Sequence, residues 1–161
     1  MKIFLKKLSC IYVGNIYAKR DWGHAKEYVE TMWKIVNYKK PDDYVISTGR
    51  QESVRKFIEL SAMQLGWDKN NKGSGIIWKN QGINEIGIRQ DTGKTVIKID
   101  PRYFRPTEVS QLLGDSSKAK EKLGWYSKTS LEELVREMVE FDLNEAKKET
   151  LLKSKGFKTR S

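Results

Sequence analysis

Cysteine and histidine are almost absent from this 161-residue chain, which contains one of each, Cys10 and His24. A single cysteine cannot form an intramolecular disulfide, and this pair cannot supply the ligands of the usual zinc sites. No apolar run approaches the roughly 20 residues that cross a bilayer, and the short, basic N-terminal stretch lacks the form of a signal peptide. We therefore expect a cytoplasmic protein that binds no metal.

Proline is also scarce, and two of the three prolines, Pro101 and Pro106, stand in one run, residues 100–109. Proline fixes φ and removes a backbone donor, so the run is predicted to be a stiff loop. Arg105 and Glu108 are three residues apart in it and can reach one ligand. The arginine suits an anion such as a phosphate, and the glutamate can accept hydrogen bonds from a polar part of the same ligand. The alternative is an internal ion pair, which contributes little when exposed.

Positive charge is abundant, with a net charge of +10, but it is unevenly distributed. Residues 1–40 carry nine Lys or Arg against three Asp or Glu, and residues 147–161 carry six against one. The middle of the chain is therefore close to neutral. A nucleic-acid-binding domain usually concentrates its basic residues on a folded face with a recognisable motif, so nucleic acid is an unfavoured partner. The basic segment 147–161 is expected to fray or to pack weakly.

Apolar periodicity predicts a single domain over residues 1–161 with a mixed α/β fold. Asp21, Ser53 and Ser130 are predicted helix N-caps, because their side chains can accept hydrogen bonds from first-turn amides. The first helix should bury a stripe formed by Trp22, Ala25, Val29, Met32, Trp33 and Val36. Helices are predicted over residues 21–36, 53–65, 116–123 and from 130 onwards, and strands over 11–14, 44–47, 76–78, 86–88 and 95–99.

Several stretches, taken in order, resemble the GDP-mannose 4,6-dehydratase family, extended short-chain dehydrogenases/reductases that act on nucleotide sugars. The stretches are Gly14-Asn15-Ile16-Tyr17-Ala18-Lys19-Arg20-Asp21-Trp22-Gly23-His24-Ala25-Lys26, the run 100–109, Leu112-Leu113-Gly114-Asp115, Lys118-Ala119 and Lys122-Leu123-Gly124-Trp125. The resemblance covers roughly residues 11–155 and corresponds to the C-terminal, substrate-binding portion of such an enzyme. It implies an α/β fold that lacks the N-terminal Rossmann domain.

Two features that the family needs for catalysis have no counterpart in the sequence. The family binds NADP through a Gly-rich turn, and the nearest candidate, Gly73-Ser74-Gly75, has Trp78 where a third glycine belongs. The family also uses a Tyr-x-x-x-Lys pair, and none of the seven tyrosines has a lysine four residues later. We therefore expect a truncated enzyme with no catalytic residues, which by itself does not bind NADP.

The resemblance assigns substrate contacts to Arg20, Arg105 and Glu108. It implies that Arg20 contacts the substrate diphosphate, whereas Arg105 and Glu108 lie at the nucleoside end. The alternative for Arg20 is a surface pairing with Asp21 or Glu27, and the family usually has aspartate where Glu27 stands. Arg102 has an equally good structural explanation as an ion-pair partner of Asp100.

The family reaction converts GDP-mannose to GDP-4-keto-6-deoxymannose with NADP, on the route to GDP-fucose and related deoxysugars. For this chain the resemblance implies recognition of GDP-mannose or a related GDP-sugar, with catalysis dependent on a missing Rossmann half or another chain of an oligomer. A second hypothesis is a non-catalytic basic module that binds RNA or an acidic protein partner. A third is a poorly folding remnant whose exposed apolar surface leads to self-association.

Overall fold

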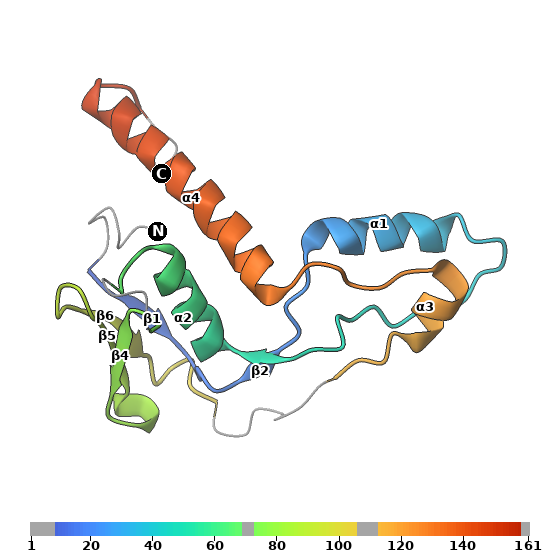
Figure 1. Cartoon of the computed structure of the whole chain (residues 1–161), viewed down its shortest axis with the longest axis horizontal. Coiled ribbons are helices and arrows are strands. Elements are labelled where there is room, and N and C mark those ends of the chain that lie inside the picture. Colours follow the sequence, from blue (N-terminus) through green and yellow to red (C-terminus); the bar gives the residue numbers. More distant parts are fainter. Residues whose placement is uncertain (1–8, 69–72, 106–112, 159–161) are drawn as a thin grey trace.

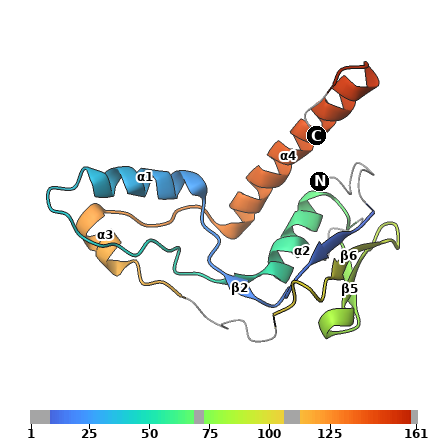
Figure 2. The same cartoon turned by 180° about the vertical axis from the view of Figure 1, so that it is seen from behind.

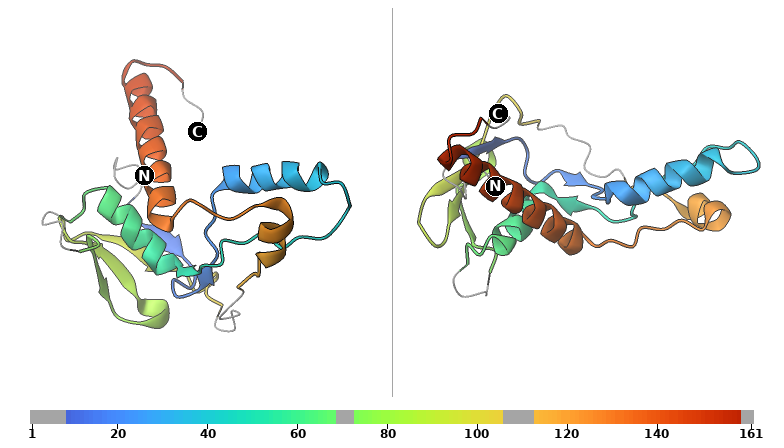
Figure 3. Two further views of the ribbon diagram at one scale, coloured as in Figure 1. Left: turned by 45° about the vertical axis from the view of Figure 1, so that its right-hand side comes forward. Right: turned by 90° about the horizontal axis from the view of Figure 1, so that it is seen from above.

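The computed structural model describes residues 9–68, 73–105 and 113–158. Figure 1 shows two parts, a sheet with two helices on one side and a flatter arm that extends away from it. We call residues 21–51 and 113–130 the arm, and the other described residues the sheet lobe. The view from above in Figure 3 places the arm and the sheet lobe at opposite ends of the molecule.

The sheet lobe is built on one mixed four-stranded sheet. Its strand order is β1 (Ile11–Val13), β6 (Thr95–Ile99), β5 (Ile86–Arg89) and β4 (Ile76–Lys79). β1 and β6 are parallel, whereas the β6–β5 and β5–β4 pairs are antiparallel, and the 3₁₀ turn η1 (Gly82–Asn84) links β4 to β5. Because β1 and β6 are parallel neighbours, the segments that follow them leave the sheet at the same edge.

Two helices are capped here: α2 (Val54–Gln64) packs on this sheet, and α4 (Leu131–Ser154) packs on α2. The predicted caps are confirmed: the Ser53 hydroxyl accepts a first-turn amide of α2, and Ser130 forms a capping box with Glu133 at the start of α4. The first core cluster joins α2 to the sheet through Ala62, Trp67, Ile76, Val96 and Ile97. The second joins α2 to α4 through Leu60, Leu131, Leu134, Val135 and Val139.

The arm contains α1 (Ala25–Val36) and the shorter α3 (Ser117–Leu123), which contact each other. The Trp125 indole donates to the Glu27 carbonyl at 3.1 Å and its ring lies edge-on to the Tyr28 ring, while Thr31 is fully buried. These contacts cover one side of α1. A two-stranded ladder of β2 (Lys19–Arg20) and β3 (Glu52–Ser53) joins the arm to the sheet lobe, as seen from behind in Figure 2.

The predicted start of the first helix was wrong. Helix α1 begins at Ala25, and its N-cap is His24, whose Nδ1 accepts the Lys26 amide at 3.1 Å. Asp21 does not cap it, because its Oδ2 accepts the Thr48 amide of a different segment at 2.8 Å. His24 is therefore a capping residue, and its Nε2 also lies 3.0 Å from the Glu137 carboxylate on α4.

Two further predictions for the arm were wrong. Residues 44–47, predicted to form a buried strand, belong to no strand in the described part of the chain. The apolar stripe predicted to pack in the core is largely exposed, since Val29, Met32, Trp33 and Val36 retain between 62% and 80% of their accessible surface. Periodicity identified the helix correctly, but the surface that would cover its stripe is not among the described residues.

The basic segment from residue 147 is helical as far as Ser154, where α4 ends, and its side chains are mostly exposed. Among the residues placed by the structure, no helix combines the length and apolar character required to cross a membrane.

Candidate functional site

Arg20, the predicted diphosphate contact, lies on the short strand β2 at the junction of the two parts. It stands opposite Glu52 in the β2–β3 register, and its guanidinium donates to the Lys19 carbonyl at 2.8 Å. The chain before it is fixed to the start of α2, because the Arg55 amide donates to the Ile16 carbonyl at 2.8 Å. The Arg20 side chain is exposed, and its backbone position is set by hydrogen bonds on both sides.

The loop that carries Arg105 is braced by an ion pair. The Asp100 carboxylate accepts the Arg102 amide at 2.9 Å and the Arg102 guanidinium at 2.7 Å. The hydrogen bonds from the Arg102 guanidinium and from the Arg102 backbone amide hold the pKa of Asp100 below its usual range. Arg102 therefore has a structural role, as the ion-pair partner of Asp100. The amides of Tyr103 and Phe104 also donate to the Asp100 carbonyl, which completes a tight turn.

The C-terminal ends of β1 and β6 are hydrogen-bonded to each other at the point where the segments that carry Arg20 and Arg105 begin. The Asp100 amide donates to the Val13 carbonyl at 2.8 Å, so the ladder continues one residue past β6. A Cβ at Gly14 would lie 2.5 Å from the Tyr103 carbonyl oxygen, so only glycine permits this approach. The segment 14–20 that ends at Arg20 and the loop 100–105 that ends at Arg105 therefore start side by side.

The third predicted contact, Glu108, lies outside the described residues. Arg105 is described and exposed. One alternative for Arg20 was a pairing with Glu27. Both Glu27 carboxylate oxygens instead accept hydrogen bonds from residues 127–129. The structure thus brings together the beginnings of the two segments that carry Arg20 and Arg105.

A buried polar network supports the Arg20 segment, and no sequence pattern pointed to it. The Glu85 side chain is 2% exposed and accepts the Tyr17 hydroxyl at 2.8 Å and the Arg55 guanidinium at 3.0 Å. The Glu85 hydrogen bond and partial burial raise the pKa of Tyr17. Arg55 also bonds Glu59 and lies over the Trp78 ring at 4.7 Å. Because Tyr17 is three residues before Arg20, this network fixes the segment against α2 and η1.

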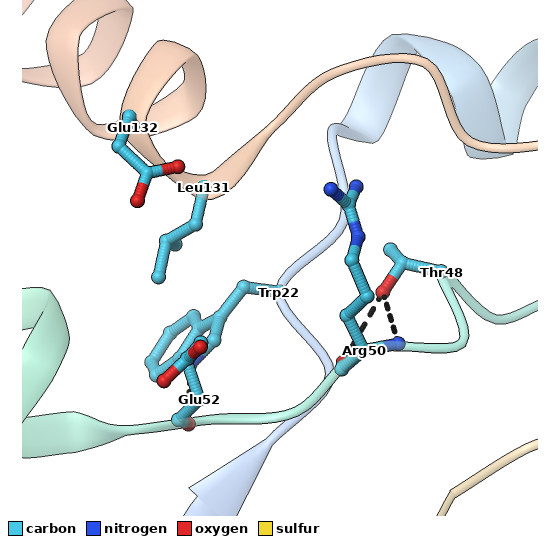
Figure 4. A pocket seen from close by; sticks show the side chains of 6 residues that line it. All are labelled: Trp22, Thr48, Arg50, Glu52, Leu131 and Glu132. Carbon is cyan, nitrogen blue, oxygen red and sulfur yellow. Dashed lines mark hydrogen bonds between the residues drawn. The ribbon is translucent and has the colours of Figure 1, made fainter.

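A small crevice opens beside the β2–β3 ladder (Figure 4). It is lined by Trp22, Thr48, Arg50, Glu52, Leu131 and Glu132, and its volume is ≈ 80 Å³. The Thr48 hydroxyl bonds both the amide and the carbonyl of Arg50, which closes a tight loop at its rim. This volume accommodates only a few water molecules, at about 30 Å³ each. The crevice is therefore too small for a nucleotide sugar.

The glycines at residues 73–75 do not form a dinucleotide-binding turn. They are followed by strand β4, whereas such a turn leads into a helix whose N-terminal amides face the pyrophosphate. Gly75 has another role, since a Cβ there would lie 2.8 Å from the backbone of Trp67 and Asp68. These residues do not fit NADP. The described residues contain no cluster of His, Cys, Asp and Glu able to hold a metal ion.

Comparisons with known proteins agree with the resemblance found in the motifs. The family model described as GDP-mannose 4,6 dehydratase matches residues 1–138. This chain belongs to the GDP-mannose 4,6-dehydratase family. It is 47% identical to the GDP-mannose 4,6 dehydratase of Cricetulus griseus, over 88% of this chain and 36% of that protein. It is 46% identical to the GDP-mannose 4,6-dehydratase of Yersinia enterocolitica, over 92% of this chain and 41% of that protein.

Solved structures support the fold assignment. RMD from Pseudomonas aeruginosa, solved with NADPH, matches with a TM-score of 0.61 at 14% identity, over 86% of this chain and 38% of that one. UDP-glucose 4-epimerase from Thermotoga maritima, solved with UDP-glucose, matches with a TM-score of 0.59 at 24% identity, over 89% of this chain and 39% of that one. The fold is thus a mixed α/β portion of an extended short-chain dehydrogenase/reductase. The chain spans about two fifths of its curated relatives' length.

Proposed function

We propose that this chain is the GDP-sugar-recognising portion of a GDP-mannose 4,6-dehydratase. The observation that carries the proposal is the parallel β1–β6 pair, which starts the Arg20 and Arg105 segments at one edge of the sheet. The arginines that these two segments carry suit the diphosphate and the nucleoside end of a GDP-sugar, and Glu108 supplies acceptors for ribose hydroxyls or the guanine edge.

The reaction proposed for the complete assembly is the NADP-dependent dehydration of GDP-mannose to GDP-4-keto-6-deoxymannose. No residue of this chain is assigned to hydride transfer or water elimination. We propose that the nicotinamide cofactor, the Tyr-x-x-x-Lys pair and hence the lyase activity come from a Rossmann portion outside this sequence. The contribution of this chain is to bind and orient the GDP-sugar.

Isothermal titration of the purified chain with GDP and GDP-mannose tests the proposal. We expect saturable binding that weakens at least tenfold in Arg20→Ala, Arg105→Ala and Glu108→Ala. The matched control is Arg136→Ala, which removes an exposed arginine from α4 and should leave the affinity unchanged. Absence of binding at millimolar GDP by a folded sample would contradict the proposal.

The same titrations distinguish GDP-sugar recognition from the second hypothesis, a basic module that binds RNA or acidic proteins. Binding through the charged termini alone would fall steeply with salt and would survive Arg105→Ala and Glu108→Ala. For GDP-sugar recognition we expect the opposite: the two substitutions weaken binding, and a polyanion such as heparin displaces GDP only weakly.

A further inference from the structure

His24, the only histidine of the chain, contacts both the arm and the sheet lobe. Its Nδ1 accepts the Lys26 amide at 3.1 Å and so caps α1, while its Nε2 lies 3.0 Å from the Glu137 carboxylate of α4, 113 positions away. Figure 1 and Figure 2 both show the start of α1 near the first turns of α4. The imidazole is largely enclosed, since 12% of its side-chain surface is exposed. One enclosed ring therefore joins the two parts of the molecule.

The two contacts specify one protonation state of the ring. A ring nitrogen that accepts an amide hydrogen carries no proton of its own, so Nδ1 is unprotonated. In a neutral imidazole the proton then resides on Nε2, which donates it to the Glu137 carboxylate. The geometry thus selects the neutral Nε2–H tautomer, and only that form of the ring satisfies both contacts.

A proton added to the ring breaks one contact and strengthens the other. Protonated Nδ1 becomes a donor that faces the Lys26 N–H, so the cap is lost. The new positive charge also lies at the N-terminal end of α1, where the helix dipole is positive. The Nε2–H bond to Glu137, in contrast, becomes a charge-assisted bond between opposite charges. Protonation therefore moves the ring away from α1 and keeps it on α4.

Charged groups around the ring act on this balance. The Lys26 ammonium shares Glu137 with the ring, because it lies 3.0 Å from the other carboxylate oxygen. Further charged groups line the cavity beside the ring or the surface hollow around Glu137, and these are Asp21, Asp142, Lys128, Glu133, Arg136 and Glu140. Carboxylates outnumber cations in this set, so Coulomb attraction stabilises a charged ring, whereas the helix cap requires a neutral one.

We propose that His24 is a pH-sensitive switch between α1 and α4. Histidine is the side chain that ordinarily changes its charge between about pH 5 and pH 8. At the upper end of this range the neutral ring caps α1 and binds α4 at the same time. At the lower end the charged ring stays on Glu137 and releases the first turn of α1, which leaves the arm held by the β2–β3 ladder and by the bonds between Glu27 and residues 127–129. The proposal does not depend on GDP-sugar binding.

NMR spectroscopy of the full chain tests the tautomer and the cap directly, because a single histidine gives one set of imidazole signals. At about pH 8 the ring should carry its proton on Nε2. As the imidazole titrates, the hydrogen-exchange protection factor of the Lys26 amide should fall about fivefold, the factor that loss of a typical helix cap implies. The control lies in the same molecule. The Lys56 amide is capped by the Ser53 hydroxyl, which does not titrate in this range, so its protection factor should stay constant.

Two variants separate this switch from a purely structural cap. His24→Asn supplies an amide oxygen that caps a helix without titrating, so the protection of the Lys26 amide should persist and become independent of pH. Glu137→Gln keeps an acceptor but removes its charge, so the midpoint of the imidazole titration should move to lower pH. The proposal is overturned if the wild-type ring carries its proton on Nδ1 at about pH 8, or if the Lys26 and Lys56 amides respond alike to pH. It is also overturned if His24→Asn retains the wild-type pH dependence, or if Glu137→Gln leaves the midpoint unchanged.

Discussion

The Glu27 carboxylate of α1 lies 2.7 Å from the Thr129 hydroxyl and 2.9 Å from the Thr129 amide, which joins residues 102 positions apart. The Lys128 amide and the Ser127 hydroxyl donate to the same carboxylate. One side chain thus ties α1 to the segment that leads into α4. The family resemblance implies aspartate at this position, which is one methylene shorter than glutamate. Glutamate in place of aspartate at position 27 therefore affects the packing of the arm.

Shortening or neutralising this side chain should destabilise the protein. We expect Glu27→Asp and Glu27→Gln to lower the free energy of unfolding by about 1–3 kcal/mol, because the shorter side chain draws the carboxylate away from the donors of residues 127–129 and the amide removes its charge. Urea denaturation measures the change. The control is Glu30→Gln on the same helix, whose exposed pair with Lys34 contributes only a few tenths of a kcal/mol, about 0.3. Equal losses in both variants would contradict the assignment.

The same carboxylate should make stability depend on acid pH. Burial alone would raise the pKa of Glu27, but the hydrogen bonds from residues 127–129 outweigh it and lower the pKa. A carboxyl with a depressed folded-state pKa stabilises the protein above its unfolded value of about 4.3, and the contribution is lost as pH falls through the folded pKa. The stability difference between wild type and Glu27→Gln should therefore be full at pH 7 and shrink below about pH 4. A difference that is independent of pH would exclude this linkage.

The network beneath the Arg20 segment should be sensitive to loss of a single hydroxyl. Tyr17→Phe removes a donor from the buried Glu85 carboxylate and should cost about 1–3 kcal/mol of unfolding free energy. It should also weaken GDP binding, because Tyr17 fixes the segment that carries Arg20. The control is Tyr12→Phe, since the Tyr12 side chain is exposed on β1. Thermal denaturation and GDP titration of both variants measure the two effects. Unchanged stability in Tyr17→Phe would contradict this role.

The contact between Gly14 and Tyr103 should couple the two candidate segments. Gly14→Ala places a methyl group at 2.5 Å from the Tyr103 carbonyl oxygen, so the loop that carries Arg105 must move away from β1. We expect a loss of about 1–3 kcal/mol in stability, as for other overpacked sites, and a weaker affinity for GDP. Gly73→Ala is the control, because its new Cβ would make only an ordinary contact, 3.6 Å from the Asp68 carboxylate. A Gly14→Ala variant that binds GDP like wild type would separate the two segments functionally.

Local sequence signals determined much of the fold. Ser53 and Ser130 marked helix starts, because a hydroxyl cap acts within three residues and needs no tertiary partner. Gly66, Gly93 and Gly124 marked turns and helix ends, and all three have the positive φ that favours glycine. The motifs in residues 14–26 and 100–109 pointed to the family, which the comparisons show.

Only the tertiary structure decided how these elements face one another. Periodicity placed Val29 and Trp33 on an apolar face but could not say that the described chain leaves this face uncovered. Residues 44–47 have strand composition, yet a strand needs a partner that local sequence cannot supply. Glu85 carried no pattern at all, and its burial depends on Tyr17 and Arg55, which lie 68 and 30 positions away. Capping and turn chemistry act between near neighbours in the sequence, whereas burial and pairing depend on distant segments that only the fold brings together.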